Sequence, residues 1–170
     1  GKSGDLELYG RQVFGLINEV YSDLYAYSRL TDKQIEGLMK EFLGMVHPDY
    51  VSVILNEQDE LVAFGLVMPS LSRALQKARG CLYPFGFWHV FKALKHNDTV
   101  DMLLIGVRPD YQGKGIHALI FEKIVGTFYK RGIRRVETTR ELENNNKVQQ
   151  LWAGYEPRQH KRARCYIREL

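Results

Sequence analysis

The chain has 170 residues, of which 45% are hydrophobic and 26% are charged, and its formal net charge at pH 7 is +4. These values suit one globular domain with a substantial core. No apolar run approaches the roughly 18 residues of a membrane span, and no secretory signal is visible, so we expect a cytoplasmic protein without a membrane partner. Because the sequence begins with Gly1 and not Met, we expect a single domain over residues 1–170 that forms the C-terminal part of a longer protein.

Cysteine and histidine positions argue against metal binding and against a disulfide framework. Cys81 and Cys165 lie far apart in the sequence, and we expect both to be free thiols in a reducing compartment. The five histidines are scattered, and no Cys/His group has metal-ligand spacing. We therefore expect no metal.

Positive charge is concentrated in the second half of the chain. Residues 1–85 hold 8 Lys/Arg against 11 Asp/Glu, whereas residues 86–170 hold 16 against 9. A basic half suits an anionic ligand, and nucleic acid is one alternative. The densest patch, Arg158–Arg164, lacks the interleaved aromatic residues of a nucleic-acid module. A solvated, charged sheet edge explains it as well, so we do not expect a nucleic-acid partner.

The first half of the chain predicts two helices followed by a hairpin. Apolar residues recur at helical spacing over 5–29, and a second helix begins at Thr31, where Gln34 completes a capping box. Residues 50–55 and 61–68 are typical of two strands joined by a polar turn. The second strand is almost entirely apolar, which predicts burial on both faces.

Residues 70–98 predict a helical insert of two short helices, at 70–79 and 84–95. Its second half is rich in aromatic residues, namely Phe85, Phe87, Trp88 and Phe91. One interpretation is a lid whose aromatic side chains line an apolar wall over an acyl or acceptor pocket. The other is a cover for the sheet, or a surface that docks on an upstream part of the protein.

The remaining elements complete an α/β fold. We expect a central strand over 100–107, a helix over 116–129 with Gly132 as its C-cap, and a strand over 135–139. Strand, helix and strand in this order imply a right-handed parallel crossover. A short helix over 144–152 and a last strand over 164–168 follow. The predicted fold is a mixed central sheet flanked by helices.

The connection from the central strand to the next helix contains the strongest functional signal. It reads Gln112-Gly113-Lys114-Gly115-Ile116-His117. Glycines allow a tight turn, and the unpaired N–H groups of a helix N-terminus attract anions. The turn could equally be a plain strand-to-helix connection, and two glycines alone do not decide between these readings.

The sequence around this turn resembles the coenzyme A signature of the GCN5-related N-acetyltransferase (GNAT) superfamily, Q/R-x-x-G-x-G/A. Gln112 and Gly115 match the signature, while His117 stands where the family has Gly or Ala. Downstream, Asn145 precedes Trp152 by seven residues, the spacing at which the family places an Asn and a Tyr. The resemblance covers about residues 50–170.

The resemblance implies a GNAT-like fold and a site for acetyl-CoA or another acyl-CoA. The cofactor-binding residues that it implies are Ile105, Gly106, Val107, Gln112, Gly113, Lys114, Gly115, Ile116, His117 and Asn145. The first three would hold the pantetheine arm through backbone hydrogen bonds, and Gly106 would permit a β-bulge.

Asp101 and Tyr155 are the candidate catalytic residues. Asp101 lies eleven residues before Gln112, where histone-type members of the superfamily have a catalytic Glu, and burial would raise the pKa of its carboxyl. It could instead cap the strand or pair with a cation. Trp152 occupies the position of the family's general acid, and an indole is no practical proton donor. Tyr155, three residues further on, could substitute, or the thiolate could leave and take its proton from water.

We therefore expect an acyl-CoA-dependent N-acyltransferase, with acetyl transfer to an amine favoured. The alternative is a non-catalytic GNAT-like module that binds coenzyme A or serves as the interaction part of a larger protein. The sequence names neither the acceptor nor the oligomeric state.

Overall fold

The computed structural model describes residues 3–25, 27–43, 46–152 and 154–164, together with Tyr166 and Arg168. Contacts within the chain divide it into two compact units, one up to Glu137 and one from Thr138 onward. The expected single domain over 1–170 stays a prediction, and each unit is described by itself below.

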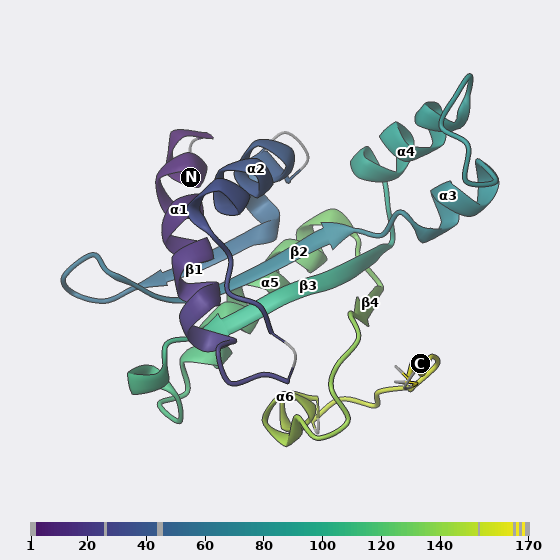
Figure 1. Ribbon diagram of the computed structural model, residues 1–170. Coiled ribbons are helices and arrows are strands. Elements are labelled where there is room, and N and C mark those ends of the chain that lie inside the picture. The colour runs from purple at the N-terminus through teal and green to yellow at the C-terminus, as the bar shows by residue number, and fades with distance from the viewer. Residues whose placement is uncertain are drawn as a thin grey trace. The chain divides into compact units, whose positions relative to one another are not determined.

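The first unit contains four strands and most of the helices (Figure 1). In chain order, the elements of this unit are α1 (Ser3–Val20), α2 (Asp32–Leu43), β1 (Val51–Leu55), β2 (Leu61–Pro69), α3 (Ser72–Lys77), α4 (Gly86–Lys95), β3 (Thr99–Val107), α5 (Ile116–Arg131) and β4 (Arg135–Thr138), whose last residue is the first of the second unit. Two short 3-10 turns, η1 (Pro48–Tyr50) and η2 (Pro109–Tyr111), precede β1 and follow β3. The second unit contains α6 (Asn146–Leu151).

The four strands form one mixed sheet in the order β1-β2-β3-β4. β1 with β2 and β2 with β3 are antiparallel pairs. The N–H groups of Arg134 and Arg135 both donate to the Asp98 carbonyl, so β4 begins beside the beginning of β3. This is the parallel arrangement that the crossover through α5 predicted, and the predicted mixed α/β fold is confirmed.

β2 is the centre of the core, with helices on both faces of the sheet. Figure 1 shows α1 and α2 in front of the sheet and α5 behind it. Phe64 packs against Leu16 and Ile17 of α1. The next residue, Gly65, faces α5, where an added Cβ would lie 2.6 Å from Ile120 and 2.9 Å from Ile124. Glycine at this position therefore lets α5 approach the sheet closely.

Local signals placed most of the helix ends correctly. The Thr31 N–H donates to Gln34 Oε1 at 2.9 Å, and the Gln34 N–H donates to Thr31 Oγ1 at 3.4 Å, which is the expected capping box. Gly132 ends α5 with φ at +68°. α1 ends earlier than predicted, and the Asn18 side chain bonds both the N–H and the carbonyl of Leu30. These bonds fold the following segment back along the helix.

The predicted strand over 164–168 is wrong for the residues that the structure describes. Arg164, Tyr166 and Arg168 belong to no strand, while Cys165 and Ile167 lie outside the described residues. The neighbouring residues from Arg158 onward are exposed, so the described part of this segment buries no apolar face that would stabilise a strand.

Candidate functional site

The glycine turn before α5 has open space beside it. Gly113 and Gly115 adopt φ values of +76° and +75°, in the left-handed region that favours glycine. A Cβ built on either residue would have nothing within 4 Å. The backbone of the turn is therefore accessible to a ligand, and these two glycines are not explained by close packing.

Backbone donors line this turn. Within the described chain, the N–H groups of Gly113, Lys114, Gly115 and Ile116 donate to no acceptor. They stand at the N-terminus of a helix of 16 residues, where the helix dipole is positive. Such a group of donors with open space in front fits a phosphate or pyrophosphate.

Polar side chains fix the turn to the end of β3. The Gln112 amide donates to the Val107 carbonyl at 3.1 Å, so this signature residue positions the turn. Arg108 pairs with Asp110 at 2.8 Å and with Glu60 at 3.2 Å, and these carboxylates raise the pKa of its guanidinium. Lys114 is exposed, with its ammonium 4.9 Å from the ring centre of Tyr111. His117 is half-buried in the first turn of α5.

β3 connects the turn to Asp101. Asp101 lies opposite Met68 of β2 and is half-buried. From Asp101 to Val107 the strand rises about 20 Å at ~3.3 Å per residue. A phosphate at the turn and a reacting group near Asp101 would therefore belong to an elongated ligand that lies along β3.

The bulge in β3 is not where the sequence suggested. Leu66 pairs with Leu104 but Val67 pairs with Met102, so the extra residue is Leu103. Gly106 pairs in regular register with Phe64, and its added Cβ would lie 2.6 Å from the Phe64 ring. The expected bulge at Gly106 is therefore wrong: this glycine makes room for a buried aromatic side chain.

Tyr21 is a residue near this strand that sequence reasoning missed. Its hydroxyl donates to the Ile105 carbonyl at 2.8 Å, and burial raises the pKa of the phenol. Nearby, Tyr27 donates to Asn18 Oδ1 at 2.7 Å. Tyr21 directly follows α1 and continues its apolar spacing four residues after Ile17, so its sequence position is typical of a packing residue and does not point to a contact with β3.

Asn145, Trp152 and Tyr155 belong to the second unit. Asn145 caps α6 by accepting a hydrogen bond from the Val148 N–H at 3.4 Å. The Trp152 indole donates to Glu141 at 2.9 Å, and Tyr155 is 58% exposed. Each has a place in this unit, and the roles expected for Asn145 and Tyr155 stay predictions.

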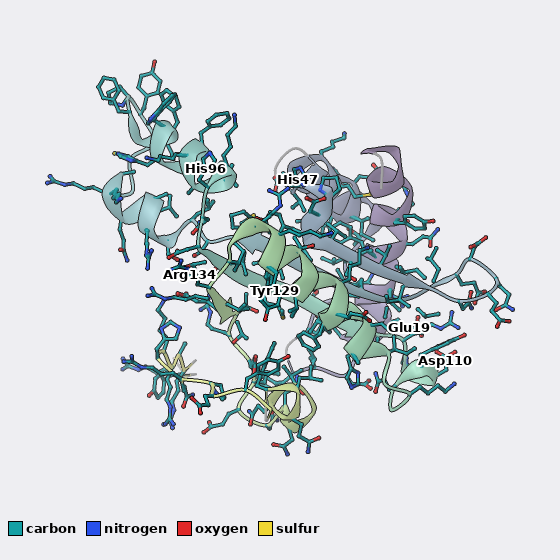
Figure 2. All side chains as sticks on the ribbon, turned by 180° about the vertical axis from the view of Figure 1, so that it is seen from behind. Glu19, His47, His96, Asp110, Tyr129 and Arg134 are labelled. Carbon is teal, nitrogen blue, oxygen red and sulfur yellow. The ribbon has the colours of Figure 1, made fainter. Side chains whose placement is uncertain are left out.

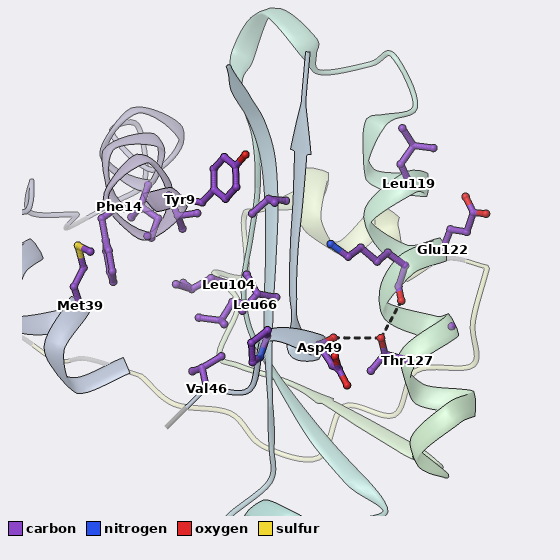
Figure 3. A pocket seen from close by; sticks show the side chains of 18 of the residues that line it. Tyr9, Phe14, Met39, Val46, Asp49, Leu66, Leu104, Leu119, Glu122 and Thr127 are labelled. Carbon is purple, nitrogen blue, oxygen red and sulfur yellow. Dashed lines mark hydrogen bonds between the residues drawn. The ribbon is translucent and has the colours of Figure 1, made fainter. Parts of the chain in front are cut away.

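An apolar cavity lies beside β1, away from the glycine turn. It is an apolar groove of about 630 Å³ beside β1, with α1 and α2 on one side and α5 on the other (Figure 3). Neither the glycine turn nor the aromatic residues of the insert line it. The insert therefore does not cover this groove, and its expected role as a lid over an acyl or acceptor pocket stays a prediction.

The described residues contain neither a metal-binding cluster nor a membrane-spanning helix. No group of three or more His, Cys, Asp or Glu side chains among them could hold a metal ion. None of the described helices combines the length and apolarity that crossing a bilayer requires.

Comparison with known proteins identifies the class. Residues 15–155 match the acetyltransferase (GNAT) family, and the chain belongs to this family. The chain is 28% identical over 138 residues to protein YghO of Escherichia coli K12, an alignment that covers 78% of this chain and 35% of YghO. The chain thus spans about a third of the length of this relative.

Solved acetyltransferase structures share the fold. Diaminobutyrate acetyltransferase EctA from Paenibacillus lautus, in complex with L-2,4-diaminobutyric acid and coenzyme A, is 18% identical with a TM-score of 0.57, covering 88% of this chain and 69% of EctA. AAC(6')-Iy, in complex with a bisubstrate analogue of coenzyme A, is 11% identical with a TM-score of 0.56, covering 96% and 93%. At these identities the likeness concerns the fold.

Proposed function

We propose that this chain is an acyl-CoA-dependent N-acyltransferase, with acetyl as the favoured acyl group and an amine as the acceptor. The observation that carries the proposal is the open glycine turn of Gly113 and Gly115, with its unengaged N–H groups, at the N-terminus of α5. Membership of the GNAT family and structural neighbours in complex with coenzyme A or its analogue support it.

Different residues along β3 and the turn after it would bind different parts of the acyl-CoA. The N–H groups from Gly113 to His117 would bind the pyrophosphate, with Lys114 beside them. The backbone of residues 105–107 would flank the pantetheine arm. The Ile105 and Val107 carbonyls already accept bonds from Tyr21 and Gln112, so their N–H groups and second lone pairs are what a ligand could use. Asn145 is the proposed contact from the second unit.

Acyl transfer also needs a base and a source of protons. A bound thioester supplies the activated acyl group. Asp101 would accept a proton from the amine, directly or through a water molecule, because an Asp side chain is short. Tyr155 would donate a proton at the leaving sulfur. The half-buried position of Asp101 in β3 is compatible with this role.

A matched pair of glycine variants tests the cofactor assignment. Gly115 and Gly132 end the same helix at opposite termini, with φ values of +75° and +68° and open space beside each. Alanine costs a similar strain at both, about 1–2 kcal/mol. Gly115→Ala should weaken coenzyme A binding at least about tenfold in calorimetry, a loss of about 1.4 kcal/mol. Gly132→Ala should bind as the wild type does.

The paired design separates strain from ligand contact. Equal affinities in both variants, with both folded by circular dichroism, would remove the turn from the site. Equal losses of coenzyme A affinity in both variants would mean that the effect comes from a destabilised helix and not from the glycine turn.

One observation favours a second function, binding of coenzyme A without catalysis. Trp152 stands where the family has its Tyr, and its indole is engaged with Glu141. A wild-type chain that binds acetyl-CoA but releases no thiol with a broad panel of amines would favour this alternative.

A further inference from the structure

The α3–α4 insert forms a helical hairpin that extends beyond the ends of β2 and β3. The two helices pack against each other. Figure 1 shows both helices beyond the sheet, and Figure 2 shows their side chains spreading away from it, with His96 near the base of the hairpin. Residues 82–91 form the far loop and the first part of α4. The hairpin is thus a separate surface of the first unit.

This surface exposes large apolar side chains to an unusual degree. Tyr83 is 88% exposed, Phe85 76% and Trp88 63%. Leu82, Phe87 and Phe91 are each more than half exposed. Six such side chains lie within ten residues of one hairpin, and exposed apolar surface concentrated in this way marks interaction sites on soluble proteins.

Backbone contacts hold the patch in its exposed form. The Phe87 N–H donates to the Leu82 carbonyl at 2.9 Å, and the Cys81 N–H to the Ala78 carbonyl at 3.0 Å. Gly86 is buried, and an added Cβ would lie 1.8 Å from the Cys81 carbonyl oxygen. The loop is therefore tightly built around Gly86, and the aromatic side chains point outward from an ordered turn.

The charge around the patch is entirely positive. Residues 72–96 contain five cations and no Asp or Glu, and all five cations are exposed: Arg73, Lys77, Arg79, Lys92 and Lys95. The Lys95 ammonium lies 4.5 Å from the ring centre of Phe91. Of these cations, Arg73 pairs with Asp98 just outside the segment. Exposed aromatic side chains on a segment whose charged residues are all cations are complementary to a surface with an apolar interior and an anionic outer layer.

We propose that the α3–α4 hairpin docks this protein on an anionic lipid bilayer. Tyr83, Phe85 and Trp88 enter the interfacial layer, where amphipathic aromatic rings are favoured. Lys77, Arg79 and Lys92 lie against the headgroups, whose negative potential attracts cations close to the surface. This is peripheral binding and requires no spanning helix. It departs from the expectation of no membrane partner, which rested on the lack of a membrane-spanning apolar run.

A protein partner is the competing occupant, and the charge pattern argues against it. Protein–protein interface cores are depleted of Lys, whereas this segment brings Lys77, Lys92 and Lys95 together without a carboxylate among them. The inference does not depend on acyltransferase activity, so failure of one leaves the other standing.

Vesicle flotation tests the proposal directly. The chain is mixed with vesicles of phosphatidylcholine alone or of phosphatidylcholine with about a third phosphatidylglycerol, a level that gives a strongly negative surface. Binding should be at least about tenfold tighter to the anionic vesicles and should weaken with added salt. In a Trp152→Phe background, Trp88 is the sole tryptophan, and its emission should shift to shorter wavelength on binding.

Two matched pairs of variants assign the binding to the hairpin. Phe85→Ser with Trp88→Ser should lose at least about tenfold in vesicle affinity, whereas Tyr129→Ser, which removes an 84% exposed ring on the outer face of α5, should not (Figure 2). Lys77→Glu with Arg79→Glu should reduce binding to the anionic vesicles much more than Lys33→Glu with Lys40→Glu, an equal change of net charge on exposed residues of α2.

The opposite results would overturn the proposal. These are the absence of binding to anionic vesicles, equal binding by the aromatic pair and by Tyr129→Ser, or equal loss from the two charge pairs. A wild type that ignores vesicles but sediments as a dimer, which Phe85→Ser with Trp88→Ser converts to a monomer, would instead make the patch a contact between copies of this chain.

Discussion

The glycines of this chain serve two physical purposes that only the structure separates. Gly65 and Gly106 occur where an added Cβ would meet Ile120 or Phe64 within 2.6 Å. Gly113 and Gly115 occur where φ is positive and the space beside them is open. Close packing explains the first pair completely. The second pair combines a backbone that favours glycine with accessible N–H groups, and this combination points to a ligand.

Asp101 is the residue whose role most needs a direct test. Asp101→Asn should leave coenzyme A affinity nearly unchanged, because Asp101 lies about 20 Å along β3 from the glycine turn. The rate of thiol release with an accepted amine should fall by about 10²–10⁴-fold, the usual contribution of a general base. Asp98→Asn is the control, since its carboxylate contacts Arg73 and Thr99 at the entry to the same strand. Equal rates for the two variants would make Asp101 structural.

At the scale of elements, a polar contact fastens α5 to the segment before β1. Asp49 of η1 accepts a hydrogen bond from Arg131 at 2.6 Å, and the Thr127 hydroxyl donates to the Asp49 carbonyl at 3.2 Å. The Arg131 hydrogen bond lowers the pKa of the Asp49 carboxyl. A carboxyl with a lowered pKa in the folded state stabilises the fold above its ordinary pKa of about 4, and this contribution is lost as the pH falls through the folded value.

Asp49→Asn should therefore be destabilising at neutral pH and less so in acid. The side chain is 52% exposed, so the expected loss of unfolding free energy at pH 7 is at most about 1 kcal/mol. Urea denaturation should show the difference from wild type shrinking below about pH 4. Glu41→Gln, at an exposed position of α2, should show no such dependence. A difference in unfolding free energy that stays constant across this pH range would mean that the Asp49–Arg131 ion pair does not stabilise the fold.

Periodicity and capping signals predicted most elements because the burial of an element's face determines which of its own residues are apolar. β2 is nearly all apolar since it is covered on both faces, and Gln34 marks the start of α2 because it completes a capping box. The β3 bulge at Leu103 and the contact of Tyr21 with Ile105 depend on register and on packing between distant segments. No residue signals these features by itself, so sequence reasoning placed the bulge wrongly and missed Tyr21.

At the scale of the whole chain, the glycine turn and the β1 groove belong to different parts of the first unit. The turn follows β3, whereas the groove is lined mainly by α1, β1 and α5, with Leu66 of β2 and Leu104 of β3 at its floor. None of the residues that the signature implies for cofactor binding lines the groove. The sequence signature pointed to the turn, and the geometry of Gly113 and Gly115 supports that choice.

The insert is attached to the first unit through a narrow base, and removing it should leave the rest of the unit folded. The Ser70 N–H donates to the Thr99 carbonyl at 2.9 Å, and the Asn97 amide donates to the Ser70 carbonyl at 2.6 Å. These bonds hold the ends of β2 and β3 together without the helices. Among the described residues, Ala74 is the only hydrophobic residue of the insert that is buried in the core.

Replacement of residues 72–96 by a short glycine linker should shift the melting temperature by less than about 4 °C, the change that about 1 kcal/mol produces at this chain length. Coenzyme A affinity should match that of the wild type, because the glycine turn lies beyond the opposite end of β3. Flotation with anionic vesicles should fall to the level of Phe85→Ser with Trp88→Ser. A chain that loses its cooperative unfolding on excision would show that the hairpin stabilises the sheet. Retained vesicle binding by a folded excised chain would place the lipid-binding surface elsewhere.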